Sequence, residues 1–259
     1  MSSIARLPLS CFIIAKDESD RIVRSIAAVR DFVDEVVVVD SGSVDRTQEL
    51  AREAGARVVF NPWRGFGQQK RFAEEQCRND WLLNIDADEV VTQQLAKEIR
   101  TLFADELPRH AAYGVSINFV YPGRRRPRLW ARDHYRLRLY DRRRIRIKDS
   151  RFHDSVDPAG HPVGRLSNEI YHFSFRSMLD LTRKCDERAS YNARWSKQKN
   201  KWGLLTRYFT EFPINFFKYY LGRRHFIGGF MGLEFASILA YYRLVRVRRL
   251  MQIQHRESV

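Results

Sequence analysis

The chain has 259 residues, of which 44% are hydrophobic and 13% aromatic, a composition that supports a packed core and excludes an intrinsically disordered protein. Lys and Arg number 46 and Asp and Glu 31, so the formal net charge is +15 at pH 7. Three widely spaced cysteines, Cys11, Cys77 and Cys185, exclude a disulfide framework and a CxxC-type zinc site and indicate a reducing compartment.

Strands and helices are predicted to alternate over the first hundred residues. The apolar run Leu9–Ala15 predicts a strand and not a signal peptide, because Pro8 interrupts the apolar stretch and Lys16 ends it. Apolar residues at helical spacing predict a helix within Asp17–Phe32, and four valines at 36–39 predict a buried central strand. The next predicted elements are a helix capped by Ser43 and ended by Gly55, a strand over Arg57–Phe60, a helix over Gln68–Arg78, a strand over Trp81–Ile85 and a helix over Thr92–Phe103. This order predicts an α/β fold with a mostly parallel sheet and right-handed crossovers.

Beyond residue 110 the pattern changes. Tyr113–Phe119 predicts a strand, and Tyr135–Tyr140 with Ile145–Lys148 predicts a basic hairpin. From Arg176 onward the pattern is helical, with predicted helices over Met178–Trp195, Trp202–Leu221 and Phe226–Tyr242. We therefore expect one domain over residues 1–175, made of halves over about 1–110 and 111–175, and a helical region over residues 176–259.

Acidic residues follow three of the predicted parallel strands. Glu18 follows the first, Asp40 the second, and Asp86 and Asp88 the fourth. Ligands of open α/β sheets bind beyond the carboxyl ends of the strands, so these residues predict a site at one edge. Gathering like charges is costly unless a cation or hydrogen-bond donors neutralise them, as a divalent metal with bound phosphates does. Neither GxGxxG nor GxxxxGK[ST] occurs, which disfavours a dinucleotide-dependent dehydrogenase and a P-loop NTPase.

Three segments carry a resemblance to a known family. They are KDES at 16–19, VVDSGSVDRT at 38–47 and WLLNIDADE at 81–89. Together they resemble the inverting family 2 glycosyltransferases of the GT-A fold, a Rossmann-like sheet flanked by helices. Further segments resemble the branch of lipopolysaccharide inner-core β-1,4-glucosyltransferases: RLYDRR at 138–143, FHDSV at 152–156, IYH at 170–172, FFKYY at 216–220 and GGFMG at 228–232.

The resemblance implies a UDP-sugar donor and a divalent cation, Mg²⁺ or Mn²⁺. It implies that Asp40 binds the uracil ring, that Glu18 contacts the nucleotide, and that Asp86 and Asp88 form the Asp-x-Asp pair, with Asp88 on the metal. His172 resembles a late histidine that completes the metal shell in some GT-A enzymes, although a lone histidine among aromatic residues is more often structural. The resemblance also divides the first domain into a nucleotide-sugar half and an acceptor half.

An inverting transfer needs a base for the acceptor hydroxyl and stabilisation of the leaving diphosphate. Asp154 stands about where the branch has Glu, one methylene longer, and is our candidate base; Glu89 is the second candidate. The alternative for Asp154 is a polar turn residue. Arg136, Arg138 and Arg142 are candidates for contacts with the diphosphate or an anionic acceptor, the alternative being a solvated surface.

The positive charge is concentrated in the second half of the chain. Residues 1–123 carry a net charge of −4, residues 124–148 of +10 and residues 176–259 of +11, which indicates an anionic partner for the back half. Nucleic acid and an anionic membrane surface compete for this role. The segment 202–220 is too rich in aromatic and aliphatic residues for a nucleic-acid face, so amphipathic helices on a membrane are favoured and nucleic acid is not expected. Phe226–Tyr242 has basic residues at both ends, so we expect it to lie in the membrane plane or re-enter.

These observations lead to three hypotheses of function. The first is a peripheral or monotopic glycosyltransferase at the cytoplasmic face of the inner membrane, adding a hexose, glucose by resemblance, to a glycolipid such as the lipopolysaccharide inner core. The second is an enzyme of the same fold that uses a polyprenyl phosphate or another membrane acceptor. The third is a binding module without catalytic activity, which the retained carboxylates disfavour.

Overall fold

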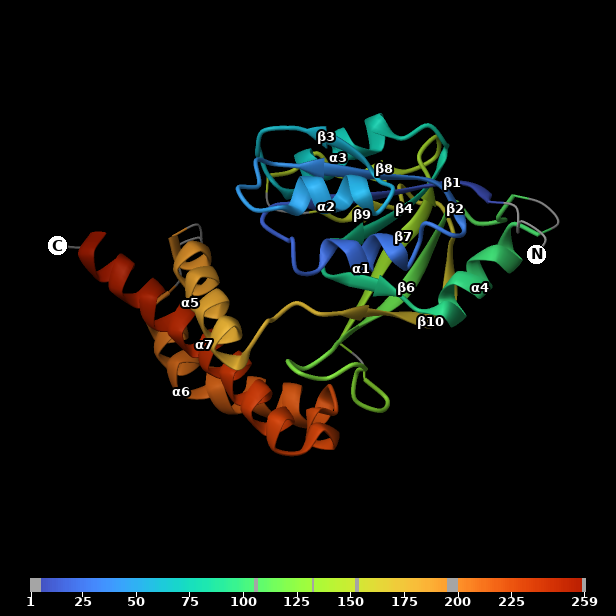
Figure 1. Ribbon diagram of the computed structural model, residues 1–259. Coiled ribbons are helices and arrows are strands. Elements are labelled where there is room, and N and C mark those ends of the chain that lie inside the picture. Colours follow the sequence, from blue (N-terminus) through green and yellow to red (C-terminus); the bar gives the residue numbers. More distant parts are fainter. Residues whose placement is uncertain (1–5, 105–106, 132, 152–153, 195–199, 258–259) are drawn as a thin grey trace. The chain divides into compact units, whose positions relative to one another are not determined.

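The structure is a computed structural model that describes residues 6–104, 107–131, 133–151, 154–194 and 200–257 (Figure 1). The chain forms two compact units: unit 1 comprises residues 1–118 and 134–172, and unit 2 comprises residues 119–133 and 173–259. The division near residue 172 lies close to the expected one at 175. The assignment of residues 119–133 to the first domain was wrong, because this segment packs with the helical unit.

Unit 1 is built on an eight-stranded sheet with the order β3-β2-β1-β4-β7-β6-β10-β5. The strands are β1 (Leu7–Ala15), β2 (Val33–Asp40), β3 (Arg57–Phe60), β4 (Trp81–Asp86), β5 (Glu89–Val91), β6 (Ala112–Phe119), β7 (His134–Asp141) and β10 (Val163–His172). β3, β2, β1 and β4 are parallel, as predicted. β7 pairs antiparallel with β4 and β6, and β10 pairs antiparallel with β5, so antiparallel strands extend the parallel part.

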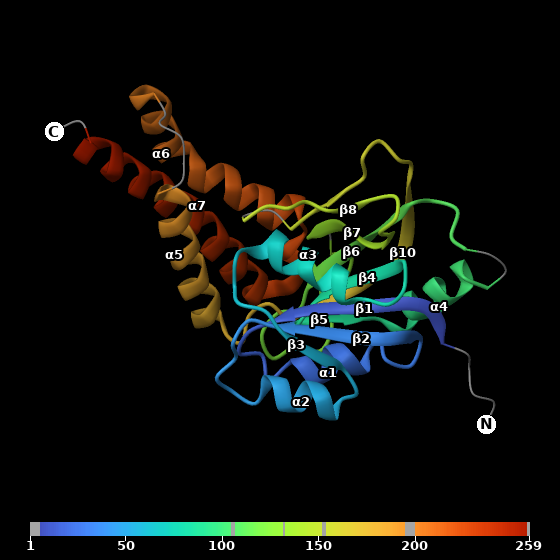
Figure 2. The same ribbon diagram turned by 90° about the horizontal axis from the view of Figure 1, so that it is seen from above.

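The valine run shows why the parallel strands are central. Val36 and Val38 belong to one apolar cluster and Val37 and Val39 to another, as the alternation of side chains along a strand requires. Side chains of α1 (Ile22–Ala27), α2 (Thr47–Glu53) and α4 (Gln93–Leu102) join the first cluster, and those of α3 (Phe66–Gln76) join the second. Figure 2 shows α3 on one side of β1 and β2, with α1 and α2 on the other side.

Several local predictions need correction. The helix expected within Asp17–Phe32 is confined to α1. Asp17 takes a positive φ of 54°, which is incompatible with a right-handed α-helix, so the helix begins after this residue. Ser43 does not cap α2; the Asp45 carboxylate instead accepts a hydrogen bond from Thr47 N at 2.9 Å. The predicted basic hairpin does not form either. Its first strand is β7, and its second is β8 (Arg146–Ile147), which pairs with β9 (Val156–Asp157).

Unit 2 consists mainly of three helices, α5 (Met178–Arg194), α6 (Lys201–Phe217) and α7 (Gly229–Glu257). α7 packs against both α5 and α6 (Figure 1). A π-helical turn, η1 (Lys218–Gly222), and a 3₁₀ turn, η2 (His225–Gly228), join α6 to α7. α7 is much longer than the predicted helix over Phe226–Tyr242. In the described part of the chain, no helix has both the length and the hydrophobicity that a membrane crossing requires.

Candidate active site

The carboxyl ends of the parallel strands bring the predicted acidic residues to one edge of the sheet. Ile14 of β1 is opposite Asp86 of β4, and Ala15 is opposite Asp40 of β2. The buried Asp40 carboxylate accepts hydrogen bonds from Gly42 N at 2.9 Å and from the Gln48 side-chain amide at 2.8 Å. Asp40 therefore shapes the loop that follows β2, and its contact with a uracil ring stays a prediction.

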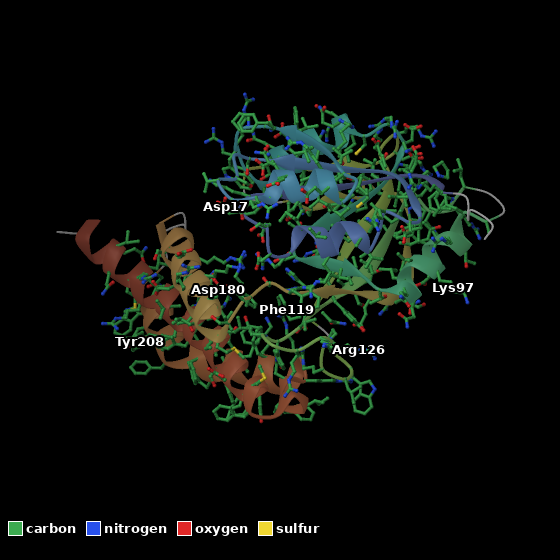
Figure 3. The ribbon with its side chains drawn as sticks, in the orientation of Figure 1. Asp17, Lys97, Phe119, Arg126, Asp180 and Tyr208 are labelled. Atoms are coloured by element: carbon green, nitrogen blue, oxygen red, sulfur yellow. The ribbon has the colours of Figure 1, made fainter. Side chains whose placement is uncertain are left out.

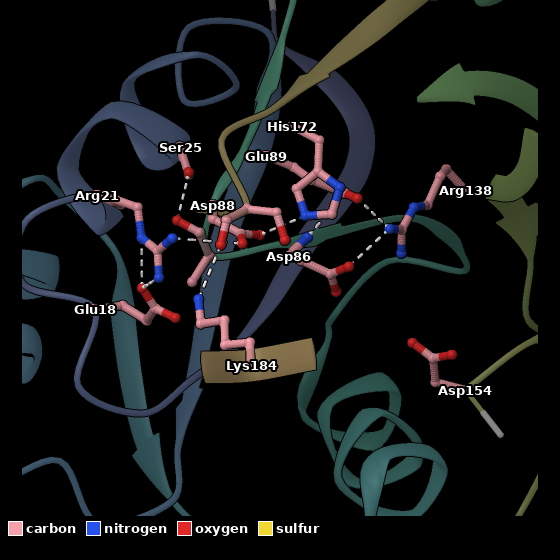
Figure 4. A network of polar contacts seen from close by, with 12 residues as sticks. Glu18, Arg21, Ser25, Asp86, Asp88, Glu89, Arg138, Asp154, His172 and Lys184 are labelled. Atoms are coloured by element: carbon pink, nitrogen blue, oxygen red, sulfur yellow. Dashed lines mark hydrogen bonds and ion pairs between the residues drawn. The ribbon is translucent and has the colours of Figure 1, made fainter. Parts of the chain in front are cut away.

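Asp86 and Asp88 lie on a tight turn between β4 and β5. The buried Ser25 hydroxyl donates to the carbonyl of Ala87 at 2.7 Å, and Asp86 N donates to the Glu89 carboxylate at 3.0 Å. These bonds fix the turn from both sides (Figure 4). Both carboxylates are thus held in place before any ligand binds, which reduces the entropy lost on binding.

His172 lies next to Asp88. The antiparallel pairing of β10 with β5 places His172 opposite Glu89, and its Nε2 is 3.2 Å from Asp88 Oδ1 (Figure 4). Burial raises the pKa of Asp88, but the imidazole of His172 more than offsets this, so the pKa is lowered. The structure therefore joins the two residues that the sequence suggested as metal ligands.

Glu18 is linked to Asp88 through Arg21, a residue that the sequence analysis did not identify. The Arg21 guanidinium donates to the Glu18 carboxylate at 2.7 Å, and its Nη1 is 3.7 Å from Asp88 Oδ2 (Figure 4). Glu18 N in turn donates to the Thr47 hydroxyl at 2.7 Å, which ties the turn after β1 to the start of α2.

Arg138 of β7 neutralises two carboxylates. Its Nη2 donates to Asp86 Oδ2 at 2.8 Å and also to Glu89 Oε1. Burial raises the pKa of Asp86, yet Arg138 and then Lys70 hold it well below its usual range. The Glu89 side chain is 1% exposed, and burial raises its pKa. Although Glu89 borders the cavity described below, its side chain is almost inaccessible, which makes it less suited than an exposed carboxylate to accept a proton from an incoming hydroxyl.

Lys70 is the main residue that sequence reasoning missed. Its side chain is 1% exposed, and its ammonium donates to Asp86 Oδ1 and to Asp154 Oδ2, both at 2.7 Å. Burial lowers the pKa of Lys70, but Asp86 and Asp154 outweigh burial and raise it. Lys70 is therefore charged and links the Asp-x-Asp turn to the candidate base.

The loop that carries Asp154 is docked on the N-terminus of α3. Phe66 N donates to the carbonyl of Arg151 at 3.3 Å, and Gly67 N to that of Ser150 at 3.0 Å, which satisfies helix N–H groups that lack intrahelical partners. A Cβ atom at Gly65 would come within 2.6 Å of the Arg151 backbone, so this approach requires glycine. Phe152 and His153 of the FHDSV segment lie outside the described residues.

A cavity of about 360 Å³ opens beside these groups, at the lower end of the usual size for a small-molecule site. Its lining residues are Asp86, Glu89, Ile117, His134, Tyr135, Arg136, Leu137, Arg138, Asp154, Ser155, Val156 and His172. Arg136 is exposed at this cavity. Arg142 does not line it, because its guanidinium donates to the carbonyls of Glu74 and Cys77 at the end of α3, both at 2.8 Å.

Asp154 has the properties of a base. Its side chain is 45% exposed and lines the cavity. Burial raises its pKa, but the Lys70 ammonium outweighs burial and lowers it, so the carboxylate is ionised at neutral pH. An ionised, accessible carboxylate beside fixed cations suits a reaction that removes a proton from one group and stabilises negative charge on another.

The residues fit a divalent metal only if a substrate supplies further ligands. Asp88 and His172 offer one carboxylate and one imidazole, and among the described residues no cluster of three or more His, Cys, Asp or Glu side chains is arranged to hold an ion. Magnesium is commonly held by one or two carboxylates together with substrate phosphates, and manganese accepts the same oxygen ligands. This donor set is suited to a metal that binds with a diphosphate.

Comparisons with known proteins identify a family model and several similar proteins. The sequence model of the family described as "Glycosyl transferase family 2" matches residues 10–161. A protein of Rickettsia bellii named "Uncharacterized glycosyltransferase" is 36% identical over 98% of this chain and 89% of its own length. The "Lipopolysaccharide core biosynthesis glycosyltransferase LpsC" of Rhizobium meliloti is 29% identical over 96% of this chain and 94% of its own. A glucosyl-3-phosphoglycerate synthase from Mycobacterium tuberculosis, crystallised with Mn²⁺, UDP and glucosyl-3-phosphoglycerate, is 24% identical over 45% of each chain, with a TM-score of 0.35.

Proposed function

Since the chain belongs to glycosyltransferase family 2 and is a nucleotide-sugar-dependent glycosyltransferase, we propose that it transfers a hexose from a UDP-sugar to an amphiphilic glycolipid with inversion at the anomeric carbon. The observation that carries this proposal is the juxtaposition in one cavity of an ionised base, Asp154, with the Asp86–Arg138 pair. Glucose is the proposed sugar, by resemblance to the lipopolysaccharide inner-core branch.

In the proposed reaction Asp154 accepts the proton of the acceptor hydroxyl as that oxygen attacks the anomeric carbon. The bond from this carbon to the diphosphate oxygen breaks, and UDP leaves with the bonding electrons. Arg138, 2.8 Å from Asp86, supplies fixed positive charge toward the cavity. Lys70 keeps Asp154 ionised and in place through its 2.7 Å hydrogen bond. Each of these groups is in place before the substrate binds, as electrostatic stabilisation of a transition state requires.

Asp88 and His172 would hold a Mg²⁺ or Mn²⁺ ion together with the diphosphate. When bound, this ion would act as a Lewis acid that stabilises the charge of the leaving group. Arg21, 3.7 Å from Asp88, orients the carboxylate from the opposite side. The roles of Asp40 and Glu18 in binding the nucleotide are part of the same proposal.

A membrane-bound acceptor is supported by the composition of unit 2 and by LpsC, whose name refers to lipopolysaccharide core biosynthesis. Many aromatic and aliphatic side chains of α6 and α7 are exposed beside arginines; Phe209 is 69% and Phe230 is 78% exposed. Such a surface suits a protein attached to the cytoplasmic face of an inner membrane. A polyprenyl phosphate is the second candidate acceptor, since its anionic head and apolar tail would suit the same surface.

The test is a transfer assay with purified protein, a panel of UDP-sugars and two acceptors, a defined inner-core glycolipid and a polyprenyl phosphate. We expect transfer of one hexose to the glycolipid, a β-linked product from an α-linked donor, and dependence on Mg²⁺ or Mn²⁺. Transfer to the polyprenyl phosphate alone would select the second acceptor. An α-linked product, or no transfer from any UDP-sugar, would contradict the proposal.

A further inference from the structure

The loop over residues 119–131 (the inserted loop) belongs to unit 2, although the strands before and after it belong to unit 1. Figure 3 marks its first residue, Phe119, and the exposed Arg126. The loop is anchored by buried polar contacts. The Arg128 guanidinium forms two hydrogen bonds with Asp133, at 2.8 and 3.0 Å, and also donates to the carbonyls of Arg223 at 2.6 Å and Arg224 at 3.2 Å.

A second set of contacts fixes the loop to the turn before α7. The Tyr121 hydroxyl is 2.6 Å from Nδ1 of His225, whose Nε2 is 3.4 Å from Asp133 Oδ1. A Cβ atom on Gly228 would lie 2.5 Å from the Tyr121 ring, so only glycine allows this packing. The loop and the turn therefore form one rigid structure within unit 2.

What this rigid loop exposes is unusual for a surface. Leu129 is 69% exposed and Trp130 71% exposed, directly after the buried Arg128. Trp130 also has a positive φ of 52°, a conformation that costs a non-glycine residue of order 1 kcal/mol or more and persists only where the surrounding structure imposes it. The structure thus holds a large apolar side chain in water at an energetic cost.

The same loop exposes positive charge without a counter-charge. Arg124, Arg125 and Arg126 are all exposed, and in the described part of the chain none of them forms an ion pair with a carboxylate. Arg128 contacts the backbone carbonyls of Arg223 and Arg224, and Phe226 lies two residues later on the same turn. Phe226 is 47% exposed, so a second exposed aromatic ring lies next to the loop. Arginine beside tryptophan and phenylalanine is the combination found at membrane interfaces.

We propose that the inserted loop is a membrane-docking element, in which Leu129 and Trp130 enter the headgroup region of an anionic phospholipid bilayer and Arg124–Arg126 bind lipid phosphates. Charge complementarity selects this partner, since three uncompensated arginines flank the apolar tip. The inference rests on the proposed membrane acceptor. It adds a contact that lies outside α6 and α7 in sequence and is joined by Arg128 and Tyr121 to the turn between these helices.

The test measures binding of the full chain to phosphatidylcholine vesicles with and without phosphatidylglycerol. We expect R124Q/R125Q/R126Q to lower the affinity for anionic vesicles about tenfold or more and to reduce its salt dependence, because each basic residue near the surface contributes. L129S/W130S should weaken binding to both kinds of vesicle. The matched controls lie on unit 1: R30Q/R52Q/R109Q removes three exposed arginines, and V44S replaces a side chain that is 93% exposed. Both controls should bind as the unmodified protein does.

A second readout locates the contact. Vesicles with brominated acyl chains should quench the fluorescence of the unmodified protein more than that of W130F, because Trp130 approaches the lipid. Equal quenching, or loop variants that bind vesicles within about twofold of the unmodified protein, would overturn the inference. Binding to a DNA duplex but not to anionic vesicles would also overturn it. Turnover of the UDP-sugar with a delipidated acceptor fragment separates the docking proposal from the proposed function. Loop variants should retain this turnover if the proposed function is right. If the proposed function is wrong, neither the unmodified protein nor any variant should show it.

Discussion

Lys70 Nζ donates a hydrogen bond of 2.7 Å to Asp154 Oδ2, joining the second turn of α3 to a loop more than eighty residues later in the chain. The same nitrogen is 2.7 Å from Asp86 Oδ1. A buried ammonium is stable between two carboxylates because their attraction offsets its loss of hydration. Lys70 therefore connects the predicted base to the predicted nucleotide side of the site.

Replacing Lys70 by methionine should lower turnover by up to about 10²-fold, because Asp154 loses the contact that positions it. It should also move the acidic limb of the pH–rate profile to higher pH. Lys70 lowers the pKa of Asp154, so without the ammonium the carboxylate becomes protonated at a higher pH. K70R, which keeps the charge, should show a smaller shift of this limb. Identical pH–rate profiles for K70M and the unmodified enzyme would remove Lys70 from this role.

Asp154→Asn tests the base directly. The substitution is nearly isosteric and abolishes proton acceptance, so turnover should fall roughly 10²–10⁴-fold while UDP affinity, measured by calorimetry, is retained. If the variant keeps more than about a tenth of the unmodified rate, Asp154 is not the base and another carboxylate accepts the proton. Glu89→Gln is the comparison: because Glu89 is buried against Arg138, its loss should lower thermal stability as well as rate.

Asp88→Ala should abolish transfer without unfolding the protein. If Asp88 and His172 hold the metal with the diphosphate, the variant should also lose the Mg²⁺-dependent part of the thermal stabilisation by UDP. Asp31→Ala is the control, since the Asp31 side chain is 81% exposed and precedes β2, at the end of the strand opposite to Asp40. Near-normal turnover of folded D88A in metal-containing buffer would refute the assignment.

Asp40→Ala should weaken UDP binding more than it slows the chemical step, because the proposed contact of Asp40 with the uracil ring is remote from the reacting carbon. The structure adds a cost in stability. Removing the carboxylate leaves Gly42 N and the Gln48 amide without their acceptor. Both donors are half-buried, so the loss of stability should stay below the roughly 1–3 kcal/mol that a fully buried donor costs. Calorimetry with UDP and thermal unfolding measure the two effects separately. Unchanged UDP affinity in the folded variant would place the uracil contact elsewhere.

The sequence predicted the parallel half of the sheet well because hydrophobic pattern alone specifies it. The run Val36–Val39 is buried on both faces, and its strand ends at Asp40 as expected. The antiparallel half was predicted poorly because its pairing is not local. β7 lies between β4 and β6, and no pattern within residues 135–148 distinguishes this from a hairpin. A second non-local pairing, that of β10 with β5, brings His172 to Asp88. The sequence analysis suggested His172 only through resemblance.

Lys70 was missed for a physical reason. With Glu74 four residues later on the same helix, it has the spacing of an exposed helical ion pair. In the structure the two side chains are buried and diverge: Lys70 bonds Asp86 and Asp154, whereas the Glu74 carboxylate accepts from the Tyr140 hydroxyl at 2.6 Å. Hydrophobic periodicity does not reveal a buried charge whose partners come from other segments.

The buried histidine of unit 2 gives a prediction for stability. Burial lowers the pKa of His225. The Asp133 carboxylate opposes this shift, whereas Arg128 and Arg223 add to it. The Tyr121 hydroxyl is 2.6 Å from Nδ1 of His225. The pKa of His225 is therefore lower in the folded protein than its ordinary value of about 6.5. As pH falls below about 6.5, the unfolded chain gains a proton that the folded chain does not, so this group reduces the free energy of unfolding.

Between the pKa of His225 in the folded protein and about pH 6.5, the free energy of unfolding should change with pH. The contribution of His225 to this slope should approach about 1.4 kcal/mol per pH unit. Denaturant unfolding at several pH values, compared between the unmodified protein and His225→Gln, isolates it, because every other titrating group is shared. The variant should be less stable at neutral pH, since it loses the Tyr121 contact, and its stability should fall less between about pH 6.5 and 5. Parallel stability curves for the two proteins would show that His225 titrates normally and that the Tyr121–His225–Asp133 contacts do not keep it neutral.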